Sequence, residues 1–183
     1  MPAPLETTRV TRLADLVRAG LVCTAAAFLV AGDDSVAVKA ALLLPATFAS
    51  RLFGASPLLD LVFTLALAAE ATGSALATHG LIAWDDRISH LVLPLLSGSV
   101  VYGALQRTRG PHRPAVAGLI TGTAVLAIAA VWEVVEWGVD ATVGTNFSMG
   151  SADTVGDLSA DAVAAAGAGA AVVVCARRSA GVA

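Results

Sequence analysis

The chain has 183 residues, of which 57% are hydrophobic and only 14% are charged, and its mean hydropathy is +0.80. Because about a quarter of the residues in a soluble domain are charged, this composition excludes an ordinary soluble protein and predicts an integral membrane protein. The net charge is −3, and the sequence has no basic run suited to nucleic acid. We therefore expect the lipid bilayer as its partner, and no nucleic acid.

The apolar residues fall into six segments, whose lengths predict membrane-spanning helices. A helix needs about 20 mainly apolar residues to cross a hydrocarbon core about 30 Å thick. After the polar residues 1–12, we expect helices at about 13–31, 36–53, 57–83, 86–105, 114–140 and 153–176. The predicted fold is an all-α, polytopic membrane helix bundle, formed as a single integral membrane domain over residues 1–183.

Proline and glycine positions predict the shape and packing of these helices. Pro45 lies inside the second segment and predicts a kink, whereas Pro114 suits the first turn of the fifth. Gly118 and Gly122 form a GxxxG pattern, and Gly167 and Gly169 lie among alanines of the sixth segment. Small residues let membrane helices approach closely, so we expect the fifth and sixth helices to pack together.

The second and third segments contain charged residues, among them Lys39, Arg51 and Glu70. Lys39 and Arg51 are near the ends of the second segment, where long side chains can reach the membrane surface. Glu70 is in the middle of the third segment. We expect it to be either a protonated acid hydrogen-bonded to Thr64 or Thr72, or a member of a proton relay.

The basic residues indicate the orientation in the membrane. With a cytoplasmic N-terminus and six spans, only Lys39 and Arg87 face the outside. The cytoplasmic segments then contain Arg9, Arg12, Arg18, Arg51, Arg107, Arg109, Arg113, Arg177 and Arg178. This bias follows the positive-inside rule and predicts a multi-pass protein of the plasma or inner membrane with both termini in the cytoplasm.

Acidic residues recur at helical spacing in the last two segments. Glu133, Glu136 and Asp140 are spaced i, i+3, i+7, and so they share one helix face. Asp153, Asp157 and Asp161 are spaced i, i+4, i+8, and Asp86 and His90 are spaced i, i+4 at the start of the fourth segment. At 1.5 Å per residue, Glu133 lies ~10 Å below Asp140 and Asp161 ~12 Å below Asp153. All three groups are therefore expected in the outer part of the membrane.

These motifs resemble a known family. Asp86-Arg-Ile-Ser-His90, then Trp132-Glu133-Val-Val-Glu136-Trp137, then Asp153-Thr-Val-Gly-Asp157 are similar, in this order, to elements of the YjdF-like bacterial inner-membrane proteins. The similarity covers about residues 55–175, and the order of acids resembles VanZ-like membrane proteins more distantly. The loop from Gly144 to Ser151 is shorter than the family's. The resemblance implies the fold and the site, and it implies no reaction.

The clustered acids predict a metal site. An ionised carboxylate buried in hydrocarbon costs several kcal/mol unless it is compensated, and a divalent cation compensates several at once. Carboxylates with an imidazole suit Mg, Mn, Zn or Fe. The predicted ligands are Asp86, His90, Glu133, Glu136, Asp153 and Asp157. Of these, Glu136 and Asp157 are the expected catalytic residues, and Arg87, Asp140 and Asp161 are expected to contact the substrate.

Plainer roles stay open for several of these residues. Asp85 or Asp86 is also suited to capping the fourth helix, and Asp153 the sixth, since aspartate is favoured at a helix N-terminus. Asp140 also fits a solvated helix end. Glu133 and Glu136 lie deeper inside an apolar helix, which favours a functional role.

Three functions remain compatible with the sequence. The first is metal-dependent hydrolysis or transfer on a lipid-borne substrate at the outer leaflet. The second is a transporter for a cation or a proton-coupled solute, although Glu70 alone marks no continuous polar path. The third is a non-catalytic structural membrane protein. The oligomeric state is left open.

Overall fold

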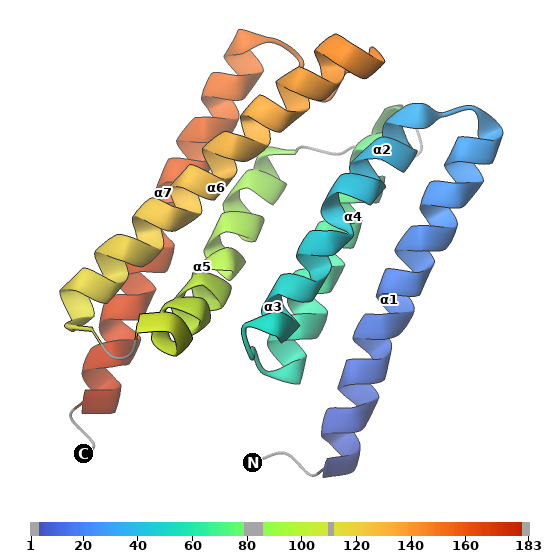
Figure 1. Ribbon diagram of the computed structural model, residues 1–183. Coiled ribbons are helices and arrows are strands. Elements are labelled where there is room, and N and C mark those ends of the chain that lie inside the picture. Colours follow the sequence, from blue (N-terminus) through green and yellow to red (C-terminus); the bar gives the residue numbers. More distant parts are fainter. Residues whose placement is uncertain (1–3, 79–85, 110–111, 181–183) are drawn as a thin grey trace. The chain divides into compact units, whose positions relative to one another are not determined.

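The computed structural model describes residues 4–78, 86–109 and 112–180 (Figure 1). Its helices are α1 (Pro4–Ala31), α2 (Asp34–Leu43), the 3-10 helix η1 (Pro45–Phe48), α3 (Ala49–Leu52), α4 (Pro57–Thr78), α5 (Arg87–Arg109), α6 (Pro114–Val143) and α7 (Ser151–Ala180). The described residues include no strand. The predicted all-α membrane helix bundle is thereby confirmed.

Five stretches of the described chain are long and apolar enough to cross a membrane: Thr8–Ala31, Asp34–Leu52, Arg87–Arg109, Pro114–Val143 and Ser151–Arg178. α4 takes the place of the third expected helix, whose predicted end at residues 79–83 lies outside the described residues. The chain divides into two compact units, Met1–Asp86 and Arg87–Ala183, here called the first and second units.

In the first unit, α1 packs against α2 and α4, and α2 packs against α4. Proline has no N–H to donate and its ring clashes with the preceding turn. At Pro45 the second expected helix therefore breaks into η1 before it resumes as α3. α1 begins at Pro4 rather than at residue 13. Hydropathy marks only the edge of the apolar segment. Polar residues can also adopt helical backbone angles, so the helix extends beyond that edge.

In the second unit, α5, α6 and α7 all contact one another. The expected close approach of α6 and α7 is present. A Cβ on Gly118 would lie 2.6 Å from the backbone oxygen of Gly169, and a Cβ on Gly169 would lie 2.7 Å from the backbone oxygen of Gly118. α6 ends at Val143 and is followed by Gly144, whose φ of +79° is a left-handed conformation that glycine adopts without strain.

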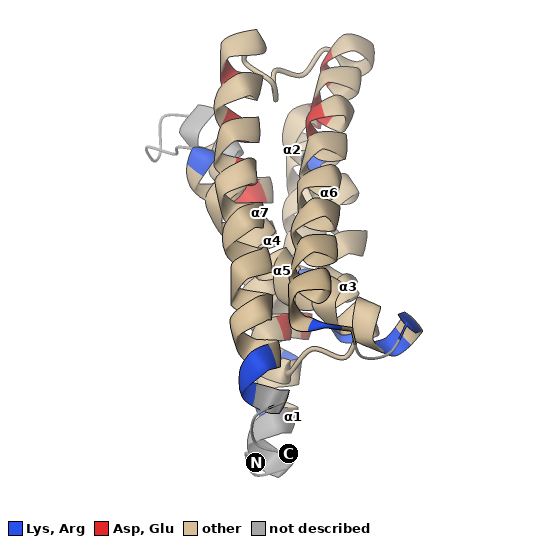
Figure 2. Cartoon of the chain, turned by 90° about the vertical axis from the view of Figure 1, so that its left-hand side faces the viewer, with Lys and Arg blue, Asp and Glu red and all other residues tan. Residues whose placement is uncertain are grey.

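Charges are sorted along α7. Asp153 lies in its first turn and Arg177 and Arg178 lie in its last turn, so Figure 2 shows acidic colour toward one end and basic colour at the other. On α6, the acids likewise lie toward the end that precedes the α6–α7 loop. Both helices therefore carry their acidic residues at the same end of the second unit.

Candidate functional site

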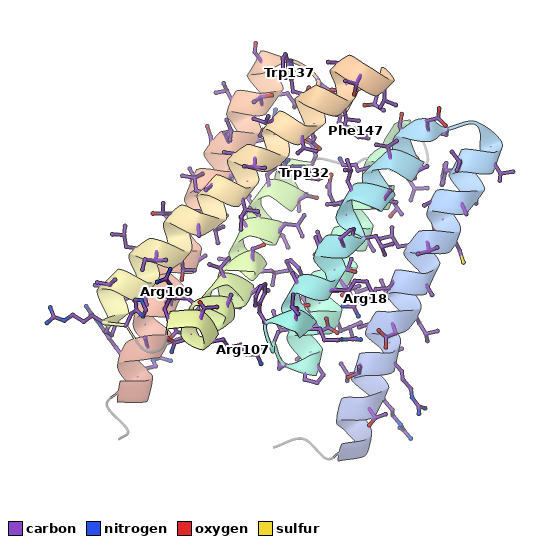
Figure 3. The ribbon with its side chains drawn as sticks, in the orientation of Figure 1. Arg18, Arg107, Arg109, Trp132, Trp137 and Phe147 are labelled. Carbon is purple, nitrogen blue, oxygen red and sulfur yellow. The ribbon has the colours of Figure 1, made fainter. Side chains whose placement is uncertain are left out.

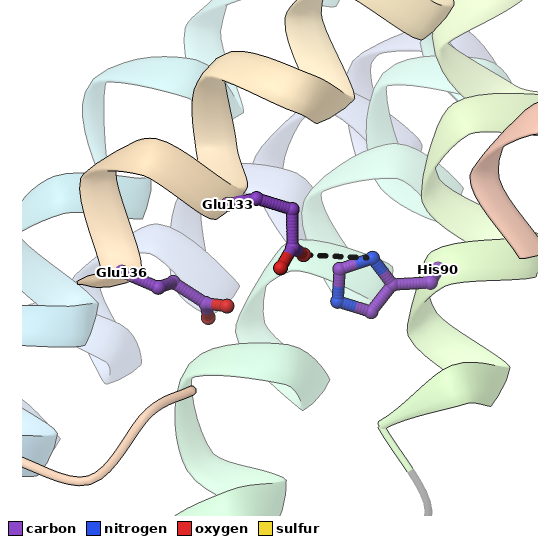
Figure 4. Close-up of side chains that lie close together, drawn as sticks. All are labelled: His90, Glu133 and Glu136. Carbon is purple, nitrogen blue, oxygen red and sulfur yellow. Dashed lines mark ion pairs between the residues drawn. The ribbon is translucent and has the colours of Figure 1, made fainter. Parts of the chain in front are cut away.

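Three buried side chains meet between α5 and α6. His90 comes from the first turn of α5, and Glu133 and Glu136 come from one face of α6. One ligand atom from each lies within 4.8 Å of the other two, and Figure 4 shows both carboxylates on the same side of the imidazole. This spacing is compatible with three ligands around a single ion.

The imidazole is held by a carboxylate from the third helix. Nδ1 of His90 lies 3.1 and 3.2 Å from the two carboxylate oxygens of Asp161, and 3.7 Å from Oε1 of Glu133. A neutral imidazole that donates its Nδ1–H to Asp161 keeps the Nε2 lone pair for a ligand. Carboxylates orient metal-binding histidines in this way.

Four carboxylates of the second unit are almost fully buried: Glu133, Glu136, Asp157 and Asp161 are 5%, 4%, 2% and 1% exposed. His90 forms ion pairs with two of them, Glu133 and Asp161. Oε1 of Glu133 accepts no hydrogen bond from a described residue. A buried ionised oxygen without a donor is strongly unfavourable, so this oxygen of Glu133 is stabilised by a proton or a cation.

The Arg87 side chain lies against Gly156 of α7. Arg87 is exposed at the start of α5, and a Cβ on Gly156 would lie 3.3 Å from its Nε. The guanidinium therefore extends beside α7 next to the residue that precedes Asp157. The contact of Arg87 with an anionic substrate stays a prediction.

Asp140 and Asp153 organise the loop between α6 and α7. The carboxylate of Asp140 accepts hydrogen bonds from Thr145 Oγ1 and the Phe147 N–H, and from the N–H and Oγ of Ser148, at 2.6 to 2.8 Å. Asp153 accepts the N–H of Met149 at 3.0 Å. The loop-holding role of Asp140 was not anticipated. Asp86 directly precedes α5, is half-buried, and ends the first unit.

The first unit has a polar network that the sequence reading missed. Asp60 of α4 accepts Ser50 Oγ at 2.7 Å, Arg51 Nη2 at 2.8 Å and Arg18 Nη2 at 2.6 Å. Arg18 also donates to the backbone oxygen of Thr47 and points from α1 toward its neighbouring helices (Figure 3). Asp60 is one isolated acid in the sequence, and only the packing shows its partners.

In the first unit, the expectation for Lys39 and one of the two alternatives for Glu70 were wrong. Lys39 does not reach the membrane surface: it is 3% exposed and forms an ion pair with Glu70. Neither proposed threonine bonds to Glu70, because Thr72 donates to the Ala68 oxygen and Thr64 to the Thr47 oxygen. Helical spacing within one segment could not reveal this pair, since its members lie on different helices.

Comparison with known proteins identifies a family. No curated protein and no solved structure matches the chain. Residues 11–180 match the model of the family described as "Predicted membrane protein (DUF2238)". The match covers nearly the whole chain and agrees with the apolar helices of the structure. The chain therefore belongs to this family of membrane proteins and is a multi-pass membrane protein.

Proposed function

We propose that the second unit binds a divalent metal ion through His90, Glu133 and Glu136. The observation that carries the proposal is their geometry: three buried ligand atoms from two helices within 4.8 Å of one another. Two further features support it. Asp161 is placed to orient the imidazole, and Oε1 of Glu133 accepts no hydrogen bond from a described residue.

The types of ligand favour some divalent metal ions over others. An imidazole with two carboxylates suits Mn, Zn or Fe better than Mg, which prefers oxygen ligands and retained waters. Three protein ligands leave positions for water or a substrate oxygen. Asp86, Asp153 and Asp157 are the further ligands that we propose from the sequence.

We propose hydrolysis or transfer on a lipid-borne substrate as the activity of this site. Glu136 and Asp157 supply the acid–base groups, since a carboxylate near a bound metal is suited to moving a proton to or from water. From the sequence we propose Arg87, Asp140 and Asp161 as substrate contacts, and the contact of Asp161 with His90 gives it a positioning role as well. Arg87 carries the positive charge that an anionic head group needs. Within its family we place the chain with YjdF-like proteins, on the order of the three motifs.

The competing function needs no metal. If His90 is protonated and the remaining acids bind protons, the same cluster is a proton or cation pathway, or a structural network. The two possibilities differ in one measurable quantity, the stoichiometric uptake of a divalent ion by the purified protein.

The experiment compares Glu136→Gln with wild type in detergent. Wild type should take up Mn²⁺ or Zn²⁺ stoichiometrically and melt at a higher temperature with the ion, because a ligand that binds the folded state stabilises it. Glu136→Gln should lose both effects and keep its helical circular dichroism spectrum. Asp34→Asn, an exposed acid at the start of α2, should behave as wild type. A wild type that takes up neither ion would overturn the proposal.

A further inference from the structure

The buried polar residues of the first unit lie in layers between the α2–α3 segment and α4. Three contacts fix the pairing of these antiparallel segments: Lys39 with Glu70, Thr47 with Thr64, and Ser50 with Asp60. The residue number rises along one segment as it falls along the other. The contacts therefore mark successive depths in the unit.

The first layer is the ion pair of Lys39 and Glu70. Both residues are nearly inaccessible, at 3% and 2% exposure. Neither carboxylate oxygen of Glu70 accepts a hydrogen bond from a described residue, and Lys39 is its ion-pair partner there. Replacing a buried ion pair by apolar residues is often neutral or stabilising, so stability alone does not account for these charges. Ionisable residues inside a membrane commonly mark paths for ions or protons.

The last layers are polar throughout. Thr64 Oγ1 donates to the Thr47 backbone oxygen at 3.4 Å, and Thr47 Oγ1 accepts Arg18 Nε at 3.2 Å. Arg18 then pairs with Asp60, which also pairs with the half-exposed Arg51. This network connects the buried interior of the unit with the end where α3 meets α4.

One apolar layer separates the two polar regions. Leu43 lies midway between Lys39 and Thr47, and Leu67 lies midway between Thr64 and Glu70. Both leucines are 5% exposed. Along α4, Thr64 and Glu70 are six residues apart, or ~9 Å at 1.5 Å per residue. Water chains or side-chain motion must cross this layer for the polar regions to connect.

We propose that the first unit contains a gated proton-transfer path, with Lys39–Glu70 as its proton-exchange site and Leu43 and Leu67 as its gate. In the exchange step, an N–H bond of the Lys39 ammonium breaks, its electron pair stays on nitrogen, and an O–H bond forms on Glu70. The ion pair becomes an amine and a carboxylic acid. The acid releases its proton through the gate toward Thr64 and Asp60. The amine regains a proton from the side of the ion pair that faces away from the gate.

The charge of Lys39 selects the transported species. An ammonium group in a low-dielectric interior repels Na⁺, K⁺ and divalent cations. A proton passes by exchange between groups and needs no space for a hydrated ion. The path therefore differs in its ligand from the proposed metal site of the second unit and shares no residue with it.

The experiment measures proton flux into vesicles that contain the reconstituted protein and a trapped pH-sensitive dye, driven by a potassium diffusion potential. The proton flux into vesicles with the wild-type protein should exceed the flux into protein-free vesicles. With Glu70→Gln, the flux should fall to the protein-free value. Leu67→Ser opens the gate and should raise the flux above wild type. Adding Glu70→Gln to Leu67→Ser should abolish that increase.

Two controls separate a path from a structural ion pair. Leu65 lies on the same helix as Leu67, but its side chain is 47% exposed. Leu65→Ser should therefore leave the proton flux at the wild-type value. Lys39→Met/Glu70→Met leaves no unpaired charge and should keep the helical spectrum while it loses the flux. A wild type without flux, or a double Met variant that conducts as wild type does, would overturn the proposal. Metal uptake should be unchanged in Glu70→Gln.

Discussion

At the residue scale, Asp161 shows how a carboxylate tunes the proposed site without binding the ion. It contacts Nδ1 of His90 with both oxygens and is 1% exposed, so the imidazole can hardly turn without breaking this contact. An oriented imidazole with a basic Nε2 is a better ligand than a free one. We therefore class Asp161 as a positioning residue.

Asp161→Asn should weaken Mn²⁺ or Zn²⁺ binding by about 10–100-fold, the usual effect of losing such a partner. The amide keeps the shape of the side chain but loses its charge, and it can present its NH₂ group to Nδ1. Isothermal titration calorimetry on the purified variant measures the change. Asp34→Asn is the matched control: this exposed acid at the start of α2 lies outside the proposed site, and its substitution should leave the binding constant unchanged. Equal affinities for Asp161→Asn and wild type would contradict the assignment.

Individual residues were predictable where a single helix carries the signal. The i, i+3 spacing of Glu133 and Glu136 on an apolar helix was enough to place them together, and both are buried. The contact of His90 with Asp161 was not predictable. Spacing fixes which face a residue occupies, whereas the neighbour of that face depends on the rotation and depth of another helix.

At the element scale, α6 and α7 approach so closely that only glycine fits at their crossing. Their backbones meet at Gly118 and Gly169, and a Cβ on either would lie under 3.0 Å from the other's carbonyl oxygen. Farther along the same two helices, Glu133 on α6 and Asp161 on α7 lie level with each other, since both contact the same imidazole nitrogen. We therefore expect that a change in the packing of α6 against α7 also disturbs the site.

Gly169→Ala should lower the free energy of unfolding by about 1–3 kcal/mol, the usual cost of overpacking, because backbone atoms cannot move aside as a flexible side chain can. It should also weaken metal binding as α6 and α7 separate. Gly138→Ala, on α6 with nothing within 4 Å of its added Cβ, should raise the stability by up to ~1 kcal/mol instead. Denaturant titration in detergent measures both. Similar effects of the two substitutions would count against this packing.

Helix ends were less predictable than helix positions. α5, α6 and α7 run to Arg109, Val143 and Ala180, beyond the expected ends at 105, 140 and 176. Hydropathy falls where the chain leaves the hydrocarbon, whereas a helix ends where its backbone finds other partners. Gly144 provides such an end for α6. Pro94, in contrast, lies inside α5 without ending it.

At the scale of the whole molecule, composition was the strongest guide. Few charges and long apolar runs left helices as the natural membrane-spanning structure, since each satisfies its own backbone hydrogen bonds. The division into two units was not anticipated, and the single domain over residues 1–183 stays a prediction. Contacts between segments that are distant in sequence determine where a chain divides into compact units. Such contacts produce no periodic pattern in the sequence.

The orientation in the membrane is the last prediction, and it rests on charge and interface residues. Arg177 and Arg178 lie in the last turn of α7. Trp137 lies near the C-terminal end of α6 (Figure 3) and is 69% exposed. Aromatic rings are enriched at membrane interfaces, so Trp137 suits the interface opposite to these arginines. Both exposed native cysteines are first replaced by alanine, and single cysteines are placed at Ser35, Thr108 and Thr145. An impermeant thiol reagent added outside intact cells should label positions 35 and 145 and spare 108. Labelling of 108 alone would reverse the orientation and place the proposed metal site near the cytoplasm.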